Sequence, residues 1–376
     1  MVFETMVGAF NVDRLTECLD EMAMLSTTRS RMIFGVPGLL AAVVALAGCR
    51  DKADSGPPSA PADEVVVYTA LDRQFSEPIL NDFSAKTGIK VLAVYDTEST
   101  KTVGLVNRIR AEAKRPRCDL FWNNEILNTL RLKNEGLLQT CQPPQGAHYP
   151  AQYRDPDGQW YGFAARARVI IVNKDLVKPE QMPKSIHDLA NPKWRGRAGI
   201  AKPLFGTTAS HVACLFAKLG DEKAKALLGS FKKNGVRVVA GNKTCAEMVA
   251  SGRLAFGLTD TDDAIIEQEG GAPVQIVFPD GSDKGMGTLL LPNTLAVVKG
   301  APHPQAAGKL MDFLLSADVE ARLAAGPSAQ IPLHTQTQAA SRVCKLANVR
   351  HMKVDFAAAA KKFATAAEYI EAEFLE

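Results

Sequence analysis

An acidic segment near the middle of the chain has the clearest potential for chemistry. It reads Thr259-Asp260-Thr261-Asp262-Asp263 and follows Leu254 to Leu258, an apolar stretch that predicts a buried strand. Carboxylate oxygens are the ligands that hard cations prefer. The alternative is that these acids only cap the helix that follows. We predict a metal site of Glu125, Asp260, Asp262 and Asp263, with Asp72 and Glu98 as further oxygen ligands for a metal ion or a polyamine.

Two arginines offer the opposite chemistry. Arg166 and Arg168 lie two residues apart in a predicted strand and therefore share one face. Guanidinium groups bind phosphonates and carboxylates, and the amides at a helix start near Thr207 and Thr208 would assist them. A salt bridge at a hinge is the alternative for the two arginines, and a simple helix cap is the alternative for Gly206-Thr207-Thr208. We favour a cation over an anion, because four clustered acids repel one another without a partner. The full predicted ligand set is Thr69, Asp72, Glu98, Asn124, Glu125, Arg166, Arg168, Thr207, Thr208, Asp260, Thr261 and Asp262.

Alternating strand and helix patterns position these residues. Val65 to Tyr68, Ile89 to Tyr95 and Asp119 to Trp122 predict strands, and Ser76-Glu77-Pro78 predicts the start of the first helix between them. This order predicts a parallel, doubly wound sheet, in which ligands lie beyond the carboxyl ends of the strands. Three polar loops fall at those ends, at residues 69–72, 96–100 and 123–125.

The second half of the chain repeats this pattern. Further strands are predicted near residues 169–172, 236–239, 254–258, 274–278 and 289–298. Thr244-x-x-Glu247 reads as a capping box at a helix start. Phe356, Phe363, Ile370 and Phe374 recur at helical spacing, so an amphipathic helix is expected at the C-terminus.

The N-terminal region predicts export and anchoring. Arg29 and Arg31 precede an apolar run that ends in Leu46-Ala47-Gly48-Cys49, which looks like a bacterial lipobox. The run is shorter than the roughly 20 residues of a membrane span. We expect residues 1–48 to be a signal peptide. The residues before about 24 are expected to come from a misassigned gene start, with the true start near Met24. Cys49 would be acylated, and residues 49–63 would form a flexible tether.

Composition narrows the function further. A net charge of +3, with no basic run, gives no support for nucleic-acid binding. The five cysteines after Cys49 have no spacing typical of zinc sites, although Cys118 and Cys141 could pair outside the cytoplasm. None of the common catalytic motifs is present, which favours a binding protein over an enzyme.

Several segments resemble extracellular solute-binding proteins of the iron(III)-importer type. They include the strand GFAARARV, the turn DLANPKW and the stretch LPNTLAVVKGAPHPQAAGKLMDFLLS, and the similarity spans residues 64 to about 335. The resemblance implies two lobes joined by hinge strands, a ligand captured between them, and delivery to a membrane permease. Iron-binding members hold the metal with adjacent tyrosines where this chain has Asp260 to Asp263, whereas the acidic position at Glu125 is kept.

We therefore expect a two-lobe α/β periplasmic-binding fold of type II. Lobe 1 would comprise residues 64–164 and about 272–316, and lobe 2 residues 165–271 and about 317–376. The predicted function is that of a monomeric, lipid-anchored receptor in the cell envelope, outside the cytoplasm. It would serve an ATP-binding-cassette (ABC) permease and its ATPase, and carry no cofactor except a metal ion as cargo. A receptor for a small anion, or a secreted enzyme on the same fold, stays open as an alternative.

Overall fold

The computed structural model describes residues 63–96 and 102–375 of the chain. The predicted signal peptide, the predicted acylation site Cys49 and the candidate ligand Glu98 lie outside these ranges. Within the described ranges, no helix is both long enough and apolar enough to cross a membrane.

The first half of the fold is a parallel sheet covered by helices. Strand β1 (Glu64–Thr69) pairs in parallel with β2 (Lys90–Tyr95) on one side and with β3 (Leu120–Asn123) on the other. The connections are α2 (Arg73–Thr87) and, before and after β3, α3 (Val103–Ala111) and α4 (Leu127–Asn134). Helix α2 begins at Arg73, before the expected start at Ser76, because the Ser76 hydroxyl bonds back to the carbonyls of Leu71 and Asp72 inside the first turn.

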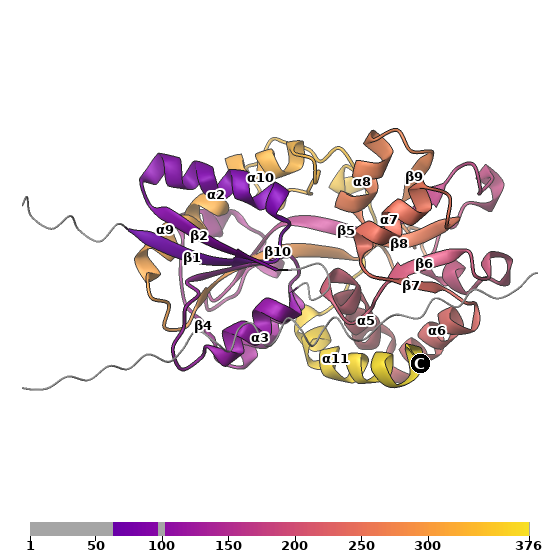
Figure 1. The fold of residues 1–376 in the computed structure, drawn as a ribbon, viewed down its shortest axis with the longest axis horizontal. Coiled ribbons are helices and arrows are strands. Elements are labelled where there is room, and N and C mark those ends of the chain that lie inside the picture. The colour runs from indigo at the N-terminus through magenta and orange to yellow at the C-terminus, as the bar shows by residue number, and fades with distance from the viewer. Residues whose placement is uncertain (1–62, 97–101, 376) are drawn as a thin grey trace, which may run out of the picture. The chain divides into compact units, whose positions relative to one another are not determined.

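Two long strands connect this half to the second. Strand β5 (Tyr161–Asn173) pairs with β10 (Leu290–Val298) through its first half and with β8 (Phe256–Asp260) through its second half. Strand β10 also pairs with β3 and with the short β4 (Leu138–Gln139). The two strands lie side by side in the middle of Figure 1 and are buried along their whole length. The strands of both halves follow one order through the sheet, β2-β1-β3-β10-β5-β8-β6-β7, where β6 is Ala198–Ala201 and β7 is Arg237–Val239.

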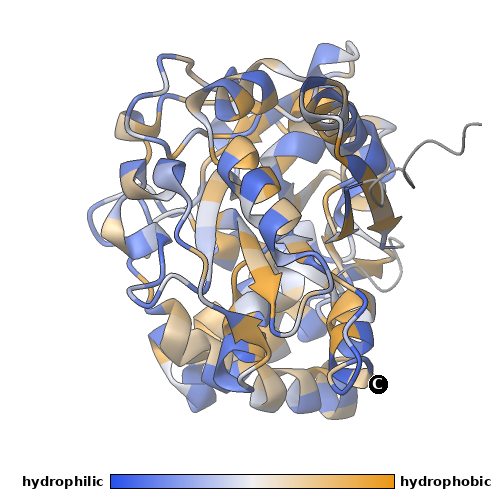
Figure 2. Cartoon of the chain, turned by 90° about the vertical axis from the view of Figure 1, so that its left-hand side faces the viewer, coloured by the Kyte–Doolittle hydropathy of each residue, from blue (hydrophilic) through white to orange (hydrophobic). Residues whose placement is uncertain are grey.

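The second half repeats the first. Strand β8 pairs in parallel with β6 (Ala198–Ala201), which pairs with β7 (Arg237–Val239), whereas β9 (Val274–Val277) runs antiparallel to β5. The helices of this half are α5 (Gly206–Leu219), α6 (Asp221–Lys233), α7 (Asn242–Ala250) and α8 (Thr261–Glu269). Figure 2 shows hydrophobic and hydrophilic stretches alternating along the helices, as expected when one face covers a sheet.

The C-terminal part of the chain returns to both halves. Helices α9 (Pro304–Leu314) and α10 (Ala317–Ala325) pack on the first half, where Arg322 of α10 forms an ion pair with Asp82 of α2 at 2.6 Å. Helix α11 (Phe356–Tyr369) packs on α5 of the second half. Its Phe363 is buried, and so are Ile370 and Phe374 in the π-helical turn Ile370–Phe374 that follows, which confirms the predicted amphipathic pattern. Because β9 belongs to the second half and α10 to the first, both placements differ from the expected lobe boundaries.

The described cysteines are all free thiols. Cys118, Cys214 and Cys245 are buried, and Cys141 and Cys344 are partly buried. The suggested pairing of Cys118 with Cys141 is therefore absent. Burial raises the pKa of the Cys118 thiol well above its ordinary value, which keeps this thiol neutral and unreactive.

Candidate functional site

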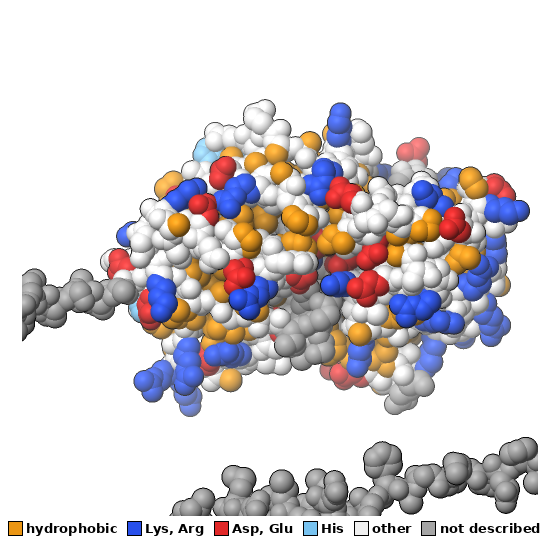
Figure 3. Space-filling model, turned by 45° about the horizontal axis from the view of Figure 1, so that its top comes forward, with side chains coloured by type: hydrophobic (Ala, Val, Ile, Leu, Met, Phe, Trp, Pro, Cys, Tyr) orange, Lys and Arg blue, Asp and Glu red, His pale blue; other side chains and the backbone are white. Residues whose placement is uncertain are grey.

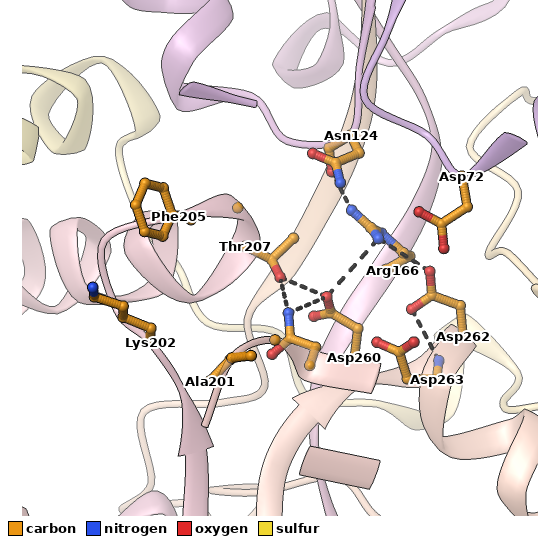
Figure 4. Close-up of a pocket in the computed structure, with 14 residues that line it drawn as sticks. Asp72, Asn124, Arg166, Ala201, Lys202, Phe205, Thr207, Asp260, Asp262 and Asp263 are labelled. Atoms are coloured by element: carbon orange, nitrogen blue, oxygen red, sulfur yellow. Dashed lines mark hydrogen bonds and ion pairs between the residues drawn. The ribbon is translucent and has the colours of Figure 1, made fainter. Parts of the chain in front are cut away.

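A polar pocket lies where the carboxyl ends of the strands from both halves meet. Elements of the first half contribute Asp72 and Asn124, and β5 contributes Arg166. In Figure 4 the guanidinium group of Arg166 occupies the centre, between Asn124 on one side and the carboxylates on the other. Figure 3 shows acidic side chains gathered near the middle of one face, beside lysine or arginine side chains. The remaining lining residues are Ala201, Lys202, Phe205, Gly206, Thr207, Ala240, Gly241, Asn242, Asp260, Asp262 and Asp263.

Asp260 lines the pocket, and Arg168 lies buried behind it. They are direct partners in the antiparallel register of β5 and β8, so the strand pairing itself brings the two side chains together. A terminal nitrogen of Arg168 lies 2.7 Å from the Asp260 carboxylate, and both side chains are at most 2% exposed. Burial alone would raise the pKa of Asp260, but Arg168 and Arg166 outweigh it and lower this pKa below its ordinary value.

Arg166 links the two halves of the protein. Its guanidinium group lies 3.0 Å from the Asp262 carboxylate and 3.9 Å from that of Asp260 in the second half. It also donates a hydrogen bond to the backbone carbonyl of Asn124 in the first half. Although burial opposes it, the charges of Asp262 and Asp260 raise the pKa of Arg166, which therefore stays protonated. Arg166 and Arg168 use the same strand face, as their spacing predicts, and both form ion pairs there.

Asn242 is a site residue that the sequence analysis missed. Its amide nitrogen donates to Asp260 at 3.0 Å and to Thr207 at 2.8 Å, and its amide oxygen accepts from Arg168 at 3.0 Å and Thr208 at 3.0 Å. Thr207 also donates to Asp260 at 2.5 Å. Asn242 begins α7, and Gly241-Asn242 follows β7 as the other polar loops follow their strands; that position was the available signal.

Three carboxylates are close enough together to hold one ion. Ligand oxygens of Asp260, Asp262 and Asp263 all lie within 4.8 Å of one another. They converge because β8 ends at Asp260 and α8 begins at once, so that its first turn projects two acids beside the strand end. Burial, with the neighbouring charge of Asp260, raises the pKa of Asp262 above its ordinary value despite the opposing effect of Arg166.

His211 lies behind the pocket on α5, one turn after Thr207. The ring is 3% exposed, and neither ring nitrogen has a hydrogen-bond partner among the described residues. Burial, together with the positive charge of Arg168, lowers the pKa of His211 to about 3, so the ring is neutral at ordinary pH. The ring therefore fills space behind the pocket and adds no charge there.

Other predicted site residues have local structural contacts. The buried Glu125 carboxylate accepts hydrogen bonds from the backbone nitrogens of Leu127 at 2.7 Å and Asn128 at 3.0 Å, at the start of α4. It also accepts one from the Ser210 hydroxyl of α5 at 2.5 Å, which is a second contact between the halves. Of the predicted ligands that the structure describes, seven line the pocket: Asp72, Asn124, Arg166, Thr207, Asp260, Asp262 and Asp263. Five others do not line it: Thr69, Glu125, Arg168, Thr208 and Thr261.

The sequence profile of bacterial extracellular solute-binding proteins matches residues 121–360. The chain belongs to this family. The predicted family and the two-lobe α/β fold are thereby confirmed, and family members are binding proteins. A curated relative, iron uptake protein A1 of a Synechocystis strain, is 31% identical over 291 residues, covering 74% of this chain and 79% of that protein.

Solved structures agree on the fold. Iron-bound HitA from Pseudomonas aeruginosa matches with a TM-score of 0.74 at 24% identity, covering 81% of this chain and 98% of HitA. AfuA from Actinobacillus pleuropneumoniae, crystallised with fructose-6-phosphate, matches with a TM-score of 0.74 at 20% identity, covering 84% and 99%. Because HitA holds iron and AfuA a sugar phosphate in these structures, the shared fold does not decide the ligand. The side chains of the pocket must decide it.

Proposed function

We propose that this chain is the receptor of an ABC importer, and that it captures a hard cation, with ferric iron the first candidate, between its two lobes. The observation that carries the proposal is the convergence of Asp260, Asp262 and Asp263 at the end of β8, in a pocket that Asp72 of the other lobe also lines. Carboxylate oxygens suit ferric iron and other hard ions. The 31% identity to an iron uptake protein supports the same ligand.

Arg166 and Arg168 shape how such a cation binds. Four acids line the pocket, Asp72, Asp260, Asp262 and Asp263, together with the cations Arg166 and Lys202, so the formal charge of the lining is −2. Arg168 lies behind Asp260 and is paired with it. An incoming cation competes with Arg166 for the Asp262 carboxylate. Asp260 keeps Arg168 as its partner in the wall behind, so the cation and Arg168 share this carboxylate. A weakly charged ion is therefore expected to lose to Arg166, and a highly charged one to displace it.

A small anion is the second candidate. Gly206 and Thr207 begin α5 at the pocket wall, and the amides at a helix start favour negative charge. Arg166 would turn from Asp262 toward such a ligand. The carboxylates of the pocket oppose an anion, which is why we favour the cation.

Isothermal titration calorimetry separates the two ligands. Ferric iron supplied as its nitrilotriacetate complex, spermidine and inorganic phosphate are titrated in turn into the metal-free protein, with nitrilotriacetate alone as the blank. We expect saturable heat with ferric iron, its loss in Asp260→Asn/Asp262→Asn, and a smaller effect of Arg166→Ala. The exposed pair Asp175→Asn/Glu180→Gln is the matched control and should bind as the wild type does. Heat with phosphate that Arg166→Ala abolishes would replace the cation by an anion.

The importer role has a separate test. A receptor of this kind should stimulate ATP hydrolysis by its own permease and ATPase when both are reconstituted in membranes. We expect stimulation by the solute-loaded chain. A failure to stimulate any such transporter encoded by the host would argue for a sensor instead.

A further inference from the structure

Three segments of the described chain lie together where the two lobes join. Strand β5 bends at Ala164, and the register between β5 and β10 shifts between Leu291 and Asn293. The third segment leads from α10 in the first lobe toward α11 in the second, and it pairs with β5 through an isolated bridge between Ala165 and Ile331. Any rotation of one lobe against the other must change the backbone at these places.

Two alanines in this region have a strained backbone. Ala164 has φ 42° and Ala329 has φ 44°, in the left-handed region that residues with a Cβ avoid. Such a conformation persists only where the surroundings hold it in place. The contacts around Ala164 must therefore supply the restraint.

The side chain of Glu320 restrains the backbone of Ala164 at its amide nitrogen. One carboxylate oxygen accepts a hydrogen bond from the Ala164 nitrogen at 2.7 Å. The other accepts from the nitrogens of Leu333 at 2.8 Å and His334 at 2.6 Å. Glu320 lies on α10 and is 1% exposed. One buried carboxylate thus ties the bend of β5 to the segment that follows α10.

Asn293 restrains the same residue from the carbonyl side. Its amide nitrogen donates to the Ala164 carbonyl and, at 2.8 Å, to the Gln330 side chain. All three segments are therefore joined through the two peptide groups of Ala164. Both side chains act on the backbone of the hinge and neither lines the solute pocket.

The groups around Glu320 are mostly uncharged or paired. Tyr149 lies beside it and donates its hydroxyl proton to the Leu315 carbonyl at 2.9 Å. The His334 ring lies edge-on to Tyr149 at 5.2 Å and 5.0 Å from the His148 ring. Helix α9 carries Lys309 and Asp312, and Asp312 accepts from the Gln145 amide. Helix α10 carries Asp318 and Arg322, the latter paired with Asp82 of α2, and β5 carries Arg166 and Arg168.

We propose that the Glu320 carboxylate stabilises the interlobe hinge through its three backbone hydrogen bonds, and we call this set of contacts the clasp. We further propose that the ionisation state of Glu320 sets how strongly the two lobes are held in the conformation that encloses the pocket. The ionised carboxylate accepts all three backbone hydrogen bonds. A proton taken up from solvent converts one oxygen to a hydroxyl, which weakens at least one of them and releases the strained bend. Burial raises the pKa of Glu320 to about 7, so the change in ionisation falls near neutral pH. The link to solute affinity rests on the proposed function, whereas the clasp itself does not.

The clasp is tested without any solute. Amide resonances of the isotope-labelled full chain are followed by NMR between pH 5.5 and 8.5. We expect the amides of Ala164, Leu333 and His334 to titrate together near pH 7. The shared titration should disappear in Glu320→Gln and persist in Asp318→Asn, an exposed acid on the same helix, and in His334→Gln, which removes the neighbouring imidazole.

Solution scattering then tests the hinge. The ligand-free wild type should have a larger radius of gyration at pH 6 than at pH 8, and Glu320→Gln should give one value at both. Separate midpoints for the three amides, or a titration that survives in Glu320→Gln, would overturn the clasp. A common titration with no change in radius would overturn its control of the lobes. Because neither readout uses solute, failure of the cation proposal appears only in the calorimetry.

Discussion

Replacing Glu320 with glutamine should remove the contribution that this carboxyl makes to the pH dependence of the free energy of unfolding. The pKa of Glu320 is raised from 4.5 to about 7 by burial. A raised carboxyl pKa means that the folded state binds the proton more tightly than the unfolded state does. The resulting stabilisation is complete below about pH 4.5 and is lost as the pH rises through about 7. A shift from 4.5 to about 7 corresponds to about 3–4 kcal/mol, at about 1.4 kcal/mol for each unit.

Urea unfolding at several pH values measures the contribution of Glu320 to the free energy of unfolding. The free energy of unfolding of the wild type minus that of Glu320→Gln should fall by about 3 kcal/mol between pH 4.5 and pH 8. Taking the difference cancels the other titrating groups, because they are common to both proteins. The same difference for Asp318→Asn, an exposed residue on the same helix, should stay nearly flat. A flat difference for Glu320→Gln as well would refute the reasoning, because the buried carboxyl would then titrate alike in both states.

Three further changes test the packing and the processing of the chain. Asp260→Ala leaves Arg168 buried without its carboxylate and should lower the free energy of unfolding by about 3–5 kcal/mol, part of which Arg168→Met in the same chain should restore. Gly257→Ala places a Cβ 2.4 Å from the Cys245 sulfur between β8 and α7, so thermal melting should show a loss of about 1–3 kcal/mol that Cys245→Ala reduces. Cys49→Ser should leave the chain unprocessed and without lipid, which intact mass and membrane fractionation report; a cleaved, membrane-bound variant would contradict the lipobox.

The strands of the fold were predictable because buried parallel strands have a simple pattern. Val65 to Tyr68 and the β-branched run from Val169 become β1 and part of β5, with nearly every side chain buried. The shared face of Arg166 and Arg168 followed from the two-residue period of a strand. What the period could not give is the partner across the sheet, because the register of β5 against β8 is set by the whole fold.

Helix starts were harder to predict than strands. A capping box pointed to Thr244, yet α7 begins at Asn242, whose side chain bonds to Asp260, Thr207 and Arg168 instead of to its own helix. Tertiary contacts therefore decide this boundary. The same limit applies to Glu125, since a sequence shows an acid after a strand but not that it folds back onto its own helix start.

The lobe boundaries depended on contacts far apart in the sequence. Helix α10 was expected in lobe 2, and it contacts α2 of the first half through Arg322 and Asp82. The clasp at Glu320 could not be predicted for the same reason, because its partner Ala164 lies 156 residues away. Local patterns contain no information about such pairs.

Crystals grown with ferric iron test the central claim most directly. Anomalous scattering measured on both sides of the iron absorption edge locates the ion without any assumption about its ligands. We predict one strong peak in the pocket, bonded to carboxylate oxygens of Asp260, Asp262 and Asp263, with Arg166 turned away from Asp262. An empty pocket from an iron-saturated sample, or an iron peak at other residues, would contradict the account.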